Sequence, residues 1–215
     1  MRFTSNLAPI LTTVQKGNLF EERSMRILQD NLSMSLRRVG GKSDGGIDLM
    51  GWWWLPHSNS AADDVTKRRR LRVLAQCKAE KKKTGPNYVR ELEGVMHRFM
   101  PLPNSSSNSE SLVALLVSES PFTKSTLLRA QSSPLPFFLL HIPPIHGADE
   151  ELSQIGTAVW NPALAGVNGL FQGQMEVRWE RSLTGVGRPG LWCGGQRVQS
   201  WTPEGPHDEL FLTDK

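Results

Sequence analysis

The sequence predicts an α/β fold in which helices flank a mixed β-sheet. Three observations support this class: an amphipathic helix comes first, two strand-like segments joined by a polar loop follow, and helical and strand-like segments then alternate. With 215 residues, of which 38% are hydrophobic and 21% charged, the chain can bury one substantial core. The expected order of elements in that core is α-β-β-α-β-α-β.

The first predicted helix covers residues 19–36, where apolar side chains such as Phe20, Ile27 and Leu32 recur at helical spacings. After it, residues 37–39 can pair at a sheet edge, and the glycines of residues 40–46 end regular structure.

Two strands are predicted next, at residues 47–55 and 71–78, with a polar loop between them. The first holds three consecutive tryptophans at positions 52–54, and we expect at least one of them in the core. The second alternates in polarity and returns beside the first, so that the two form the central strand pair.

The remaining core elements follow from apolar stripes and runs. Pro86 can begin a second helix whose apolar stripe ends before Pro101. A continuous apolar run at residues 112–118 is typical of a buried parallel strand. We expect a further helix at residues 123–131 and a further strand at 137–142.

The pattern divides the chain into three segments. Residues 1–18 contain Arg2 and Lys16 and no acid, which fits either a mitochondrial targeting segment or a short polar lead-in to the helix. Residues 19–145 form the predicted core. Residues 146–215 are rich in glycine, with one possible strand at 174–179, and predict an irregular C-terminal extension that packs on the core.

The composition limits the kinds of partner and site that the chain is expected to have. The two cysteines, Cys77 and Cys193, lie far apart, so neither a disulfide framework nor a zinc site is expected, and a reducing compartment is favoured. The longest apolar stretches are too short for a membrane-spanning helix, and we expect no membrane partner. The formal charge of +4 is compatible with a phosphate-rich partner.

Asp48, Gln76 and Lys78 carry the predicted chemistry. Asp48 begins one strand of the central pair and the other two end its partner, so all three should converge at one rim of the sheet. Gln76 and Lys78 are two residues apart and therefore share a face. One acid, one amide oxygen and one ammonium group then meet.

This inventory suits the hydrolysis of a phosphodiester bond. Hard oxygen ligands hold Mg²⁺ (or Mn²⁺), and a cation orients the attacking water or stabilises the charge that develops on the phosphate. Asp48 would be the charged ligand, with the side-chain oxygen of Gln76 and the main-chain carbonyl of Cys77 as further ligands. Lys78 would be the cation. Because Gln76 is neutral, the affinity for the metal should be lower than at a two-acid site.

Basic residues gather in the central third of the chain and predict phosphate contacts. The alternatives are a solvated basic loop or a nuclear import signal. Arg90 could instead position Lys78. The candidates for contact with nucleic acid are Lys42, Arg69, Arg70, Lys81, Lys82, Lys83 and Arg90.

Residues 41–49, GKSDGGIDL, together with residues 76–78, QCK, resemble the Mrr-type branch of the PD-(D/E)XK restriction-endonuclease superfamily. Residues 17–21, GNLFE, are similar to that family's Phe-Glu signature, which implies that Glu21, with Glu22 as its rival, completes the metal site. Residues 89–94, VRELEG, and 115–123, LLVSESPFT, resemble the later helix and strand of the same core. The resemblance implies a restriction-endonuclease-like fold and covers residues 17–142.

The same motifs are also similar to a fungal mitochondrial family required for respiratory growth, which implies a location in the mitochondrial matrix. The leading hypothesis is therefore a Mg²⁺-dependent DNA endonuclease or DNA-processing protein, with RNA and a homodimer left open. The alternative is an inactive protein of the same fold that binds nucleic acid or supports a mitochondrial assembly. A protein-interaction domain is a third hypothesis, favoured if the basic runs lie apart in space.

Overall fold

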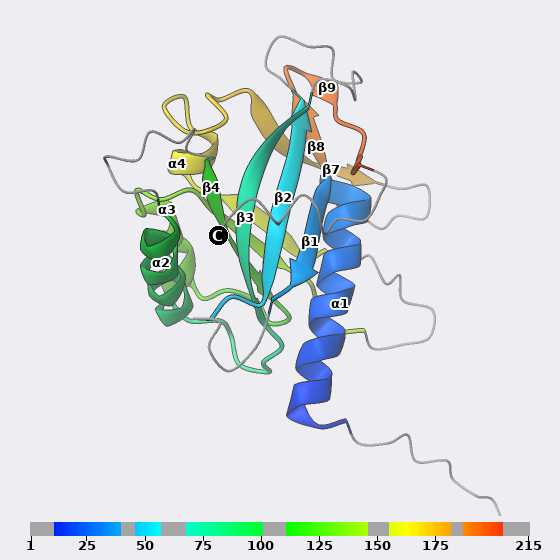
Figure 1. Ribbon diagram of the computed structural model, residues 1–215, viewed down its shortest axis with the longest axis vertical. Helices are drawn as coiled ribbons and strands as arrows, with labels where there is room; N and C mark the ends of the chain where they lie inside the picture. Colours follow the sequence, from blue (N-terminus) through cyan, green and yellow to red (C-terminus); the bar gives the residue numbers. More distant parts are fainter. Residues whose placement is uncertain are drawn as a thin grey trace, which may run out of the picture.

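A six-stranded mixed sheet lies at the centre of the fold in the computed structural model (Figure 1), which describes residues 11–39, 46–56, 68–100, 111–145, 155–181 and 187–203. Its strands, in spatial order, are β1 (Met34–Arg38), β2 (Leu49–Pro56), β3 (Arg68–Lys78), β4 (Leu112–Ser118), β5 (Phe137–His141) and β6 (Thr157–Trp160). The pairs β1–β2, β2–β3 and β5–β6 are antiparallel, and β3–β4 and β4–β5 are parallel.

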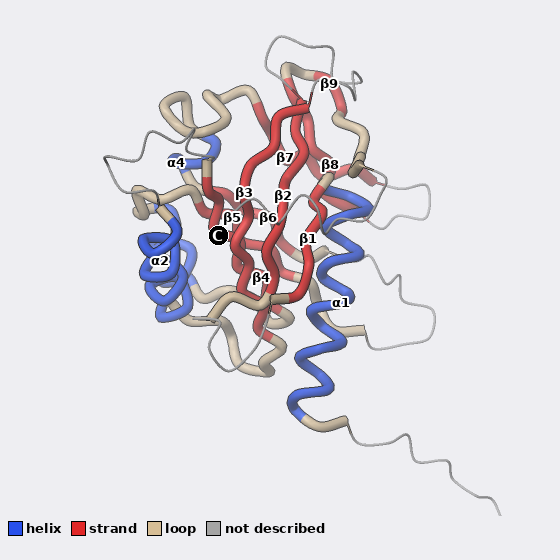
Figure 2. The backbone as a smooth tube through the Cα atoms, in the orientation of Figure 1, coloured by secondary structure: helices blue, strands red, loops and turns tan. Residues whose placement is uncertain are grey.

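Helices cover both faces of this sheet (Figure 2). Helix α1 (Thr13–Leu32) packs with one set of strand residues, including Val73 and Ala75, whereas α2 (Asn87–Phe99) packs with the opposite set, including Leu74. Helix α3 (Lys124–Gln131) lies on the same side as α2. The predicted fold class, a mixed sheet flanked by helices with a C-terminal extension, is confirmed.

The first helix begins and ends earlier than predicted. Thr12 caps the helix with a reciprocal pair of hydrogen bonds. Its hydroxyl accepts from the main-chain N–H of Gln15, and its own N–H donates to the Gln15 Oε1. At the other end Ser33 adopts a left-handed φ of 56°, and its N–H donates to the hydroxyl of Ser200. Leu36 therefore lies in an additional strand, β1, and the order of elements is α-β-β-β-α-β-α-β.

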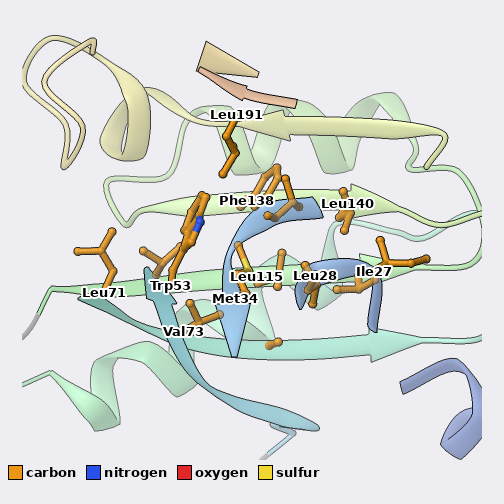
Figure 3. Close-up of a cluster of buried hydrophobic side chains, with 14 of the residues drawn as sticks. Ile27, Leu28, Met34, Trp53, Leu71, Val73, Leu115, Phe138, Leu140 and Leu191 are labelled. Atoms are coloured by element: carbon orange, nitrogen blue, oxygen red, sulfur yellow. The ribbon is translucent and has the colours of Figure 1, made fainter. Parts of the chain in front are cut away.

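The later core elements agree with the prediction to within one to three residues at most boundaries, and β4 covers the predicted residues 112–118. Trp53 is fully buried, stacked on Phe138 at 5.6 Å between ring centroids with an interplanar angle of 8°. Figure 3 shows both rings inside the cluster of apolar side chains between α1 and the sheet. The expectation that at least one tryptophan lies in the core is confirmed.

The C-terminal segment adds a strand to the main sheet and also forms a second sheet. Strand β6 extends the main sheet, short helix α4 (Pro162–Ala165) follows, and β7 (Met175–Arg181), β8 (Gly187–Cys193) and β9 (Gln196–Arg197) form a second sheet. Leu191 of β8 joins the core beside Phe138 (Figure 3). In the part of the chain described here, no helix is long and apolar enough to cross a membrane.

Asn161 fastens this segment to the core. Its side-chain amide donates to the carbonyls of Ala130, Ser133 and Leu135, and its Oδ1 accepts from the main-chain N–H groups of Phe137 and Leu164. The residue is 1% exposed, so these bonds satisfy a fully buried amide.

Candidate functional site

Asp48 is held on the central sheet immediately before β2. Its N–H donates to the carbonyl of Ala75 at 2.9 Å, and its carbonyl accepts from the N–H of Val39 at 3.0 Å. Its carboxylate Oδ2 accepts from the main-chain N–H of Cys77 at 2.6 Å. The acid is therefore fixed beside the end of β3, where the sequence places the two other residues of the predicted constellation.

Gln76 is buried next to this carboxylate, with 3% of its surface exposed. Its Oε1 is buried and has no hydrogen-bond partner among the described residues. Gly46, whose φ is +89°, lies close by, since a Cβ there would sit 3.3 Å from the Gln76 Nε2. A buried carbonyl oxygen without a donor costs about 1–3 kcal/mol, which a hard cation at that position would offset.

Lys78 shares a face of β3 with Gln76, because the two are separated by one residue. Its Nζ lies 4.6 Å from the ring centroid of Tyr88, in the first turn of α2. The Tyr88 hydroxyl donates to the Glu80 carboxylate at 2.6 Å, and this bond, together with partial burial, raises the pKa of Tyr88 to about 12. The ring therefore remains neutral beneath the ammonium group.

Glu21 approaches from the other side of the sheet. Its carboxylate pairs with the guanidinium of Arg38 on β1 at 2.6 Å. Burial raises the pKa of the Cys77 thiol well above its usual range, and the negative charges of Asp48 and Glu21 raise it further. Both acids are thus close enough to act on one thiol. Glu22, the rival candidate, is exposed and lines a hollow along the outer side of α1.

The inventory of acids at this position is small. In the described ranges, no group of three or more His, Cys, Asp or Glu side chains is arranged to hold a metal ion. The possible ligands are two carboxylates, from Asp48 and Glu21, and the amide oxygen of Gln76. On the face of Gln76, Asp48 and Gln76 can hold one divalent cation with water completing the coordination, whereas Glu21 lies on the α1 side, where Cys77 points.

The basic residues predicted to contact nucleic acid fall into two separate groups, one on β3 and one after it. Arg69 donates to the carbonyl of Leu170 and lies over the ring of Phe171 at 5.9 Å, and its burial lowers the pKa of its guanidinium. Arg70 stacks on Trp52 at 4.1 Å. At about 3.3 Å per strand residue, Arg69 lies about 30 Å from Lys78. Neither arginine lies beside the Asp48 end of the sheet.

The second basic group lies at the correct end. Lys81, Lys82 and Lys83 follow β3 directly and are exposed. Arg90 is exposed on α2 and donates to Asn87 Oδ1 at 3.0 Å. Lys42 lies outside the described residues.

Sequence reasoning missed two side chains that touch this site. Tyr88 lies in the second predicted helix, for which only an apolar stripe was expected. A tyrosine, however, also has a polar end that needs a partner when the ring is packed. The pairing of Arg38 with Glu21 also went unpredicted, because it depends on β1 lying beside α1.

The fold and these residues define an α/β protein in which Asp48, the buried amide of Gln76 and Lys78 lie at one end of the central strands. Glu21 lies on the α1 side of the same sheet. Residues 12–165 match the family model described as "Required for respiratory growth protein 7". This match spans more than half of the chain, and the chain belongs to that family.

Individual relatives agree with this assignment. The Saccharomyces cerevisiae protein "Required for respiratory growth protein 7, mitochondrial" is 31% identical over 169 residues, covering 64% of this chain and 68% of its own length. The Candida glabrata protein of the same name is 28% identical over 193 residues, covering 72% and 75%. An uncharacterized mitochondrial protein of Schizosaccharomyces pombe is 32% identical over 151 residues, covering 69% and 51%.

No solved structure matches the chain. The names of these three relatives mention no nuclease, so the resemblance to PD-(D/E)XK enzymes stays a prediction. The family match extends past Ile142, where the motif resemblance ended, and includes β6 and α4.

Proposed function

We propose that this chain is a mitochondrial protein that hydrolyses phosphodiester bonds in DNA with the help of a divalent metal ion. The observation that carries the proposal is the buried, unpartnered Oε1 of Gln76 next to the carboxylate of Asp48. A folded chain seldom leaves such an oxygen without a donor unless a ligand satisfies it. The mitochondrial location is inferred from the names of the relatives, which are called mitochondrial.

In this proposal Asp48 and Gln76 would hold Mg²⁺ or Mn²⁺, with Glu21 and the main-chain carbonyl of Cys77 as further ligands. When bound, the metal would polarise the phosphate and lower the pKa of a water molecule. The N–H of Cys77 fixes one carboxylate oxygen of Asp48, so that this acid needs no rearrangement to act. Gln76 brings an oxygen without a charge.

Lys78 would supply the positive charge that the reaction needs. Its ammonium group would orient the attacking water or stabilise the extra charge on the phosphate as the bond to the leaving oxygen breaks. Tyr88 holds this group in place, because the ring lies under Nζ and its hydroxyl is anchored on Glu80. Lys81, Lys82 and Lys83 would contact phosphates on either side of the scissile bond.

A cleavage assay tests the proposal. Supercoiled plasmid is incubated with Mg²⁺ or Mn²⁺ and with the wild-type chain, Asp48→Ala or Lys78→Ala, and nicking is followed on a gel. We expect nicking by the wild type, a loss of at least a hundredfold in both variants and none in EDTA. Equal nicking by all three proteins would show that a contaminant cuts the DNA and that the assignment is wrong.

One contact favours a second function, an inactive protein of the same fold that binds nucleic acid. Glu21, the acid that would complete the metal site, is already neutralised by Arg38 at 2.6 Å. The distance between the two groups of basic residues likewise favours the third hypothesis, a protein-interaction domain. Tight DNA binding without cleavage in the same assay would support the inactive protein, and the absence of both would support the interaction domain.

A further inference from the structure

A groove of about 500 Å³ lies between the first half of α1 and the chain that follows β3, β4 and β5. Leu19 and Arg23 of α1 form one wall, and Lys81 and Ile145 belong to the other. The side chain of Arg23 bridges them, since its Nη1 donates to the carbonyl of Pro143 at 2.7 Å. The volume of the groove suits a small ligand or a short stretch of an extended chain.

This groove lies at the same end of the sheet as the candidate site, on its α1 side. Phe20 and Ala79 line it, and each is the chain neighbour of a proposed site residue, Glu21 and Lys78 respectively. A polymer that crosses this end of the sheet can contact both the candidate site and the groove.

The charge of the groove is positive. Lys16, Arg23 and Lys81 line it, against the single acid Glu119, and α1 has no acidic residue in its first turn. Among the described residues, neither Lys16 nor Lys81 forms an ion pair. Two exposed ammonium groups on opposite walls favour an anionic occupant.

A neighbouring hollow along α1 provides a comparison. It has about the same size, about 480 Å³, and shares Leu19 and Arg23 with the groove. There, however, Glu22 and Asp30 balance Arg23 and Arg26. The excess of positive charge is therefore confined to the part of α1 beside the candidate site.

The groove is also lined by apolar side chains. Leu11, Leu19 and Ile145 line it and are exposed to 38%, 50% and 39%, which is high for large aliphatic side chains. A duplex presents mainly phosphates and sugars at its surface, whereas a single strand also offers the faces of its bases. Lysines at the rim with aliphatic side chains between them suit the second kind of ligand.

We infer that the groove binds the flank of a single-stranded nucleic acid next to the candidate site, with Lys16 and Lys81 contacting its phosphates. This inference rests on the proposed function, because it names the substrate class of that site. It implies a substrate with an unpaired strand at or beside the bond that is cut.

The test is a binding measurement on the full chain in EDTA, which prevents cleavage. A fluorescein-labelled oligothymidylate of about ten nucleotides is titrated by fluorescence anisotropy at several salt concentrations, beside a hairpin duplex of the same charge. For Lys16→Ala/Lys81→Ala we expect the Kd for the single strand to rise about tenfold. We also expect the salt slope to fall by about 1.4, or about 0.7 for each phosphate that a lysine no longer neutralises.

The matched control is Arg98→Ala/Arg178→Ala, which removes the same charge from two exposed positions outside the groove. We expect it to change the Kd by less than about threefold. Circular dichroism is used to check that both double variants are folded. The inference is overturned if the groove variant binds like the control, or if the duplex binds as tightly as the single strand. The two proposals can fail separately. If the groove variant loses binding and the wild-type chain does not cut plasmid, the inference is supported and the proposed hydrolysis is refuted.

Discussion

Replacing Gln76 by glutamate changes one heavy atom of the candidate site. The effect of this change on stability distinguishes a site that binds a cation from one that does not. The side chain is 3% exposed, and its Oε1 has no partner among the described residues. In the absence of metal, the Gln76→Glu carboxylate would be buried close to the carboxylate of Asp48. If the site holds a cation, however, the same change supplies the second acid that the natural sequence lacks.

The cost without metal follows from burial. Desolvation raises the pKa of a buried carboxylate by up to about 3–5 units, and a shift of about 2 units corresponds to about 3 kcal/mol. A pKa raised above its unfolded value of about 4.3 means that the loss is absent below about pH 4. The loss grows as the pH rises to the folded-state pKa and is constant above it. We therefore expect Gln76→Glu to be about 3 kcal/mol less stable at pH 8 in EDTA.

Metal should reverse this loss. A ligand present at about 100 times its Kd adds about 2.7 kcal/mol to the free energy of unfolding. Urea unfolding is followed by tryptophan fluorescence with EDTA and with Mn²⁺, using Gln29→Glu as the control, because Gln29 is exposed on α1. The reasoning is refuted if Mn²⁺ stabilises Gln76→Glu no more than the control, or if Gln76→Glu is as stable as the wild type in EDTA.

Three further predictions follow from individual contacts. Asn161→Ala should lower the free energy of unfolding by about 3 kcal/mol, because it strands several buried main-chain groups; a loss below about 1 kcal/mol in urea would contradict the assigned contacts. Tyr88 is the only tyrosine, and its pKa of about 12 means that its ultraviolet absorbance at pH 11 should still be mainly that of the neutral phenol. Stability from the Tyr88 bond should be complete below about pH 10 and decline as the pH rises toward 12, a decline that Tyr88→Phe would lack. In a Cys193→Ser background, the Cys77 thiol should react with Ellman's reagent at pH 8 much more slowly than after unfolding, because its pKa is raised; equal rates would show that the thiol is accessible.

Much of the core could be predicted because its signals are local. The apolar run at residues 112–118 and the apolar stripe of α2 each fix an element from its own side chains. The strand pair β2–β3 was predicted in the same way. These patterns were enough to establish the class of fold.

Strand β1 depends on contacts between distant segments, whereas β7 of the second sheet lies where a strand was predicted, at residues 174–179. Ser33 ends α1 with help from Ser200, and its hydroxyl also accepts from the N–H of Trp201. No pattern within residues 19–36 reveals this end. In the second sheet, Gly190 of β8 lies against the carboxylate of Glu180, which would have to move to admit a Cβ there.

The candidate site shows the same division. Asp48, Gln76 and Lys78 meet at one end of the sheet, as spacing and strand pairing predict. Of the predicted phosphate contacts, Arg69 lies about 30 Å from Lys78, nine strand steps away, whereas Lys81, Lys82 and Lys83 lie at the end of Lys78. Tyr88 reaches Lys78 only because α2 folds back over the end of β3.

The most direct measurement of the central claim is nuclear magnetic resonance with Mn²⁺ as a paramagnetic probe. The side-chain amide signal of Gln76 and the main-chain amide signal of Cys77 are assigned and followed as Mn²⁺ is added. A metal held by Asp48 and Gln76 predicts that both signals broaden at substoichiometric Mn²⁺ in the wild type, and that neither does so in Asp48→Asn. Broadening confined to exposed acids such as Glu176, with Gln76 unaffected, would contradict the account.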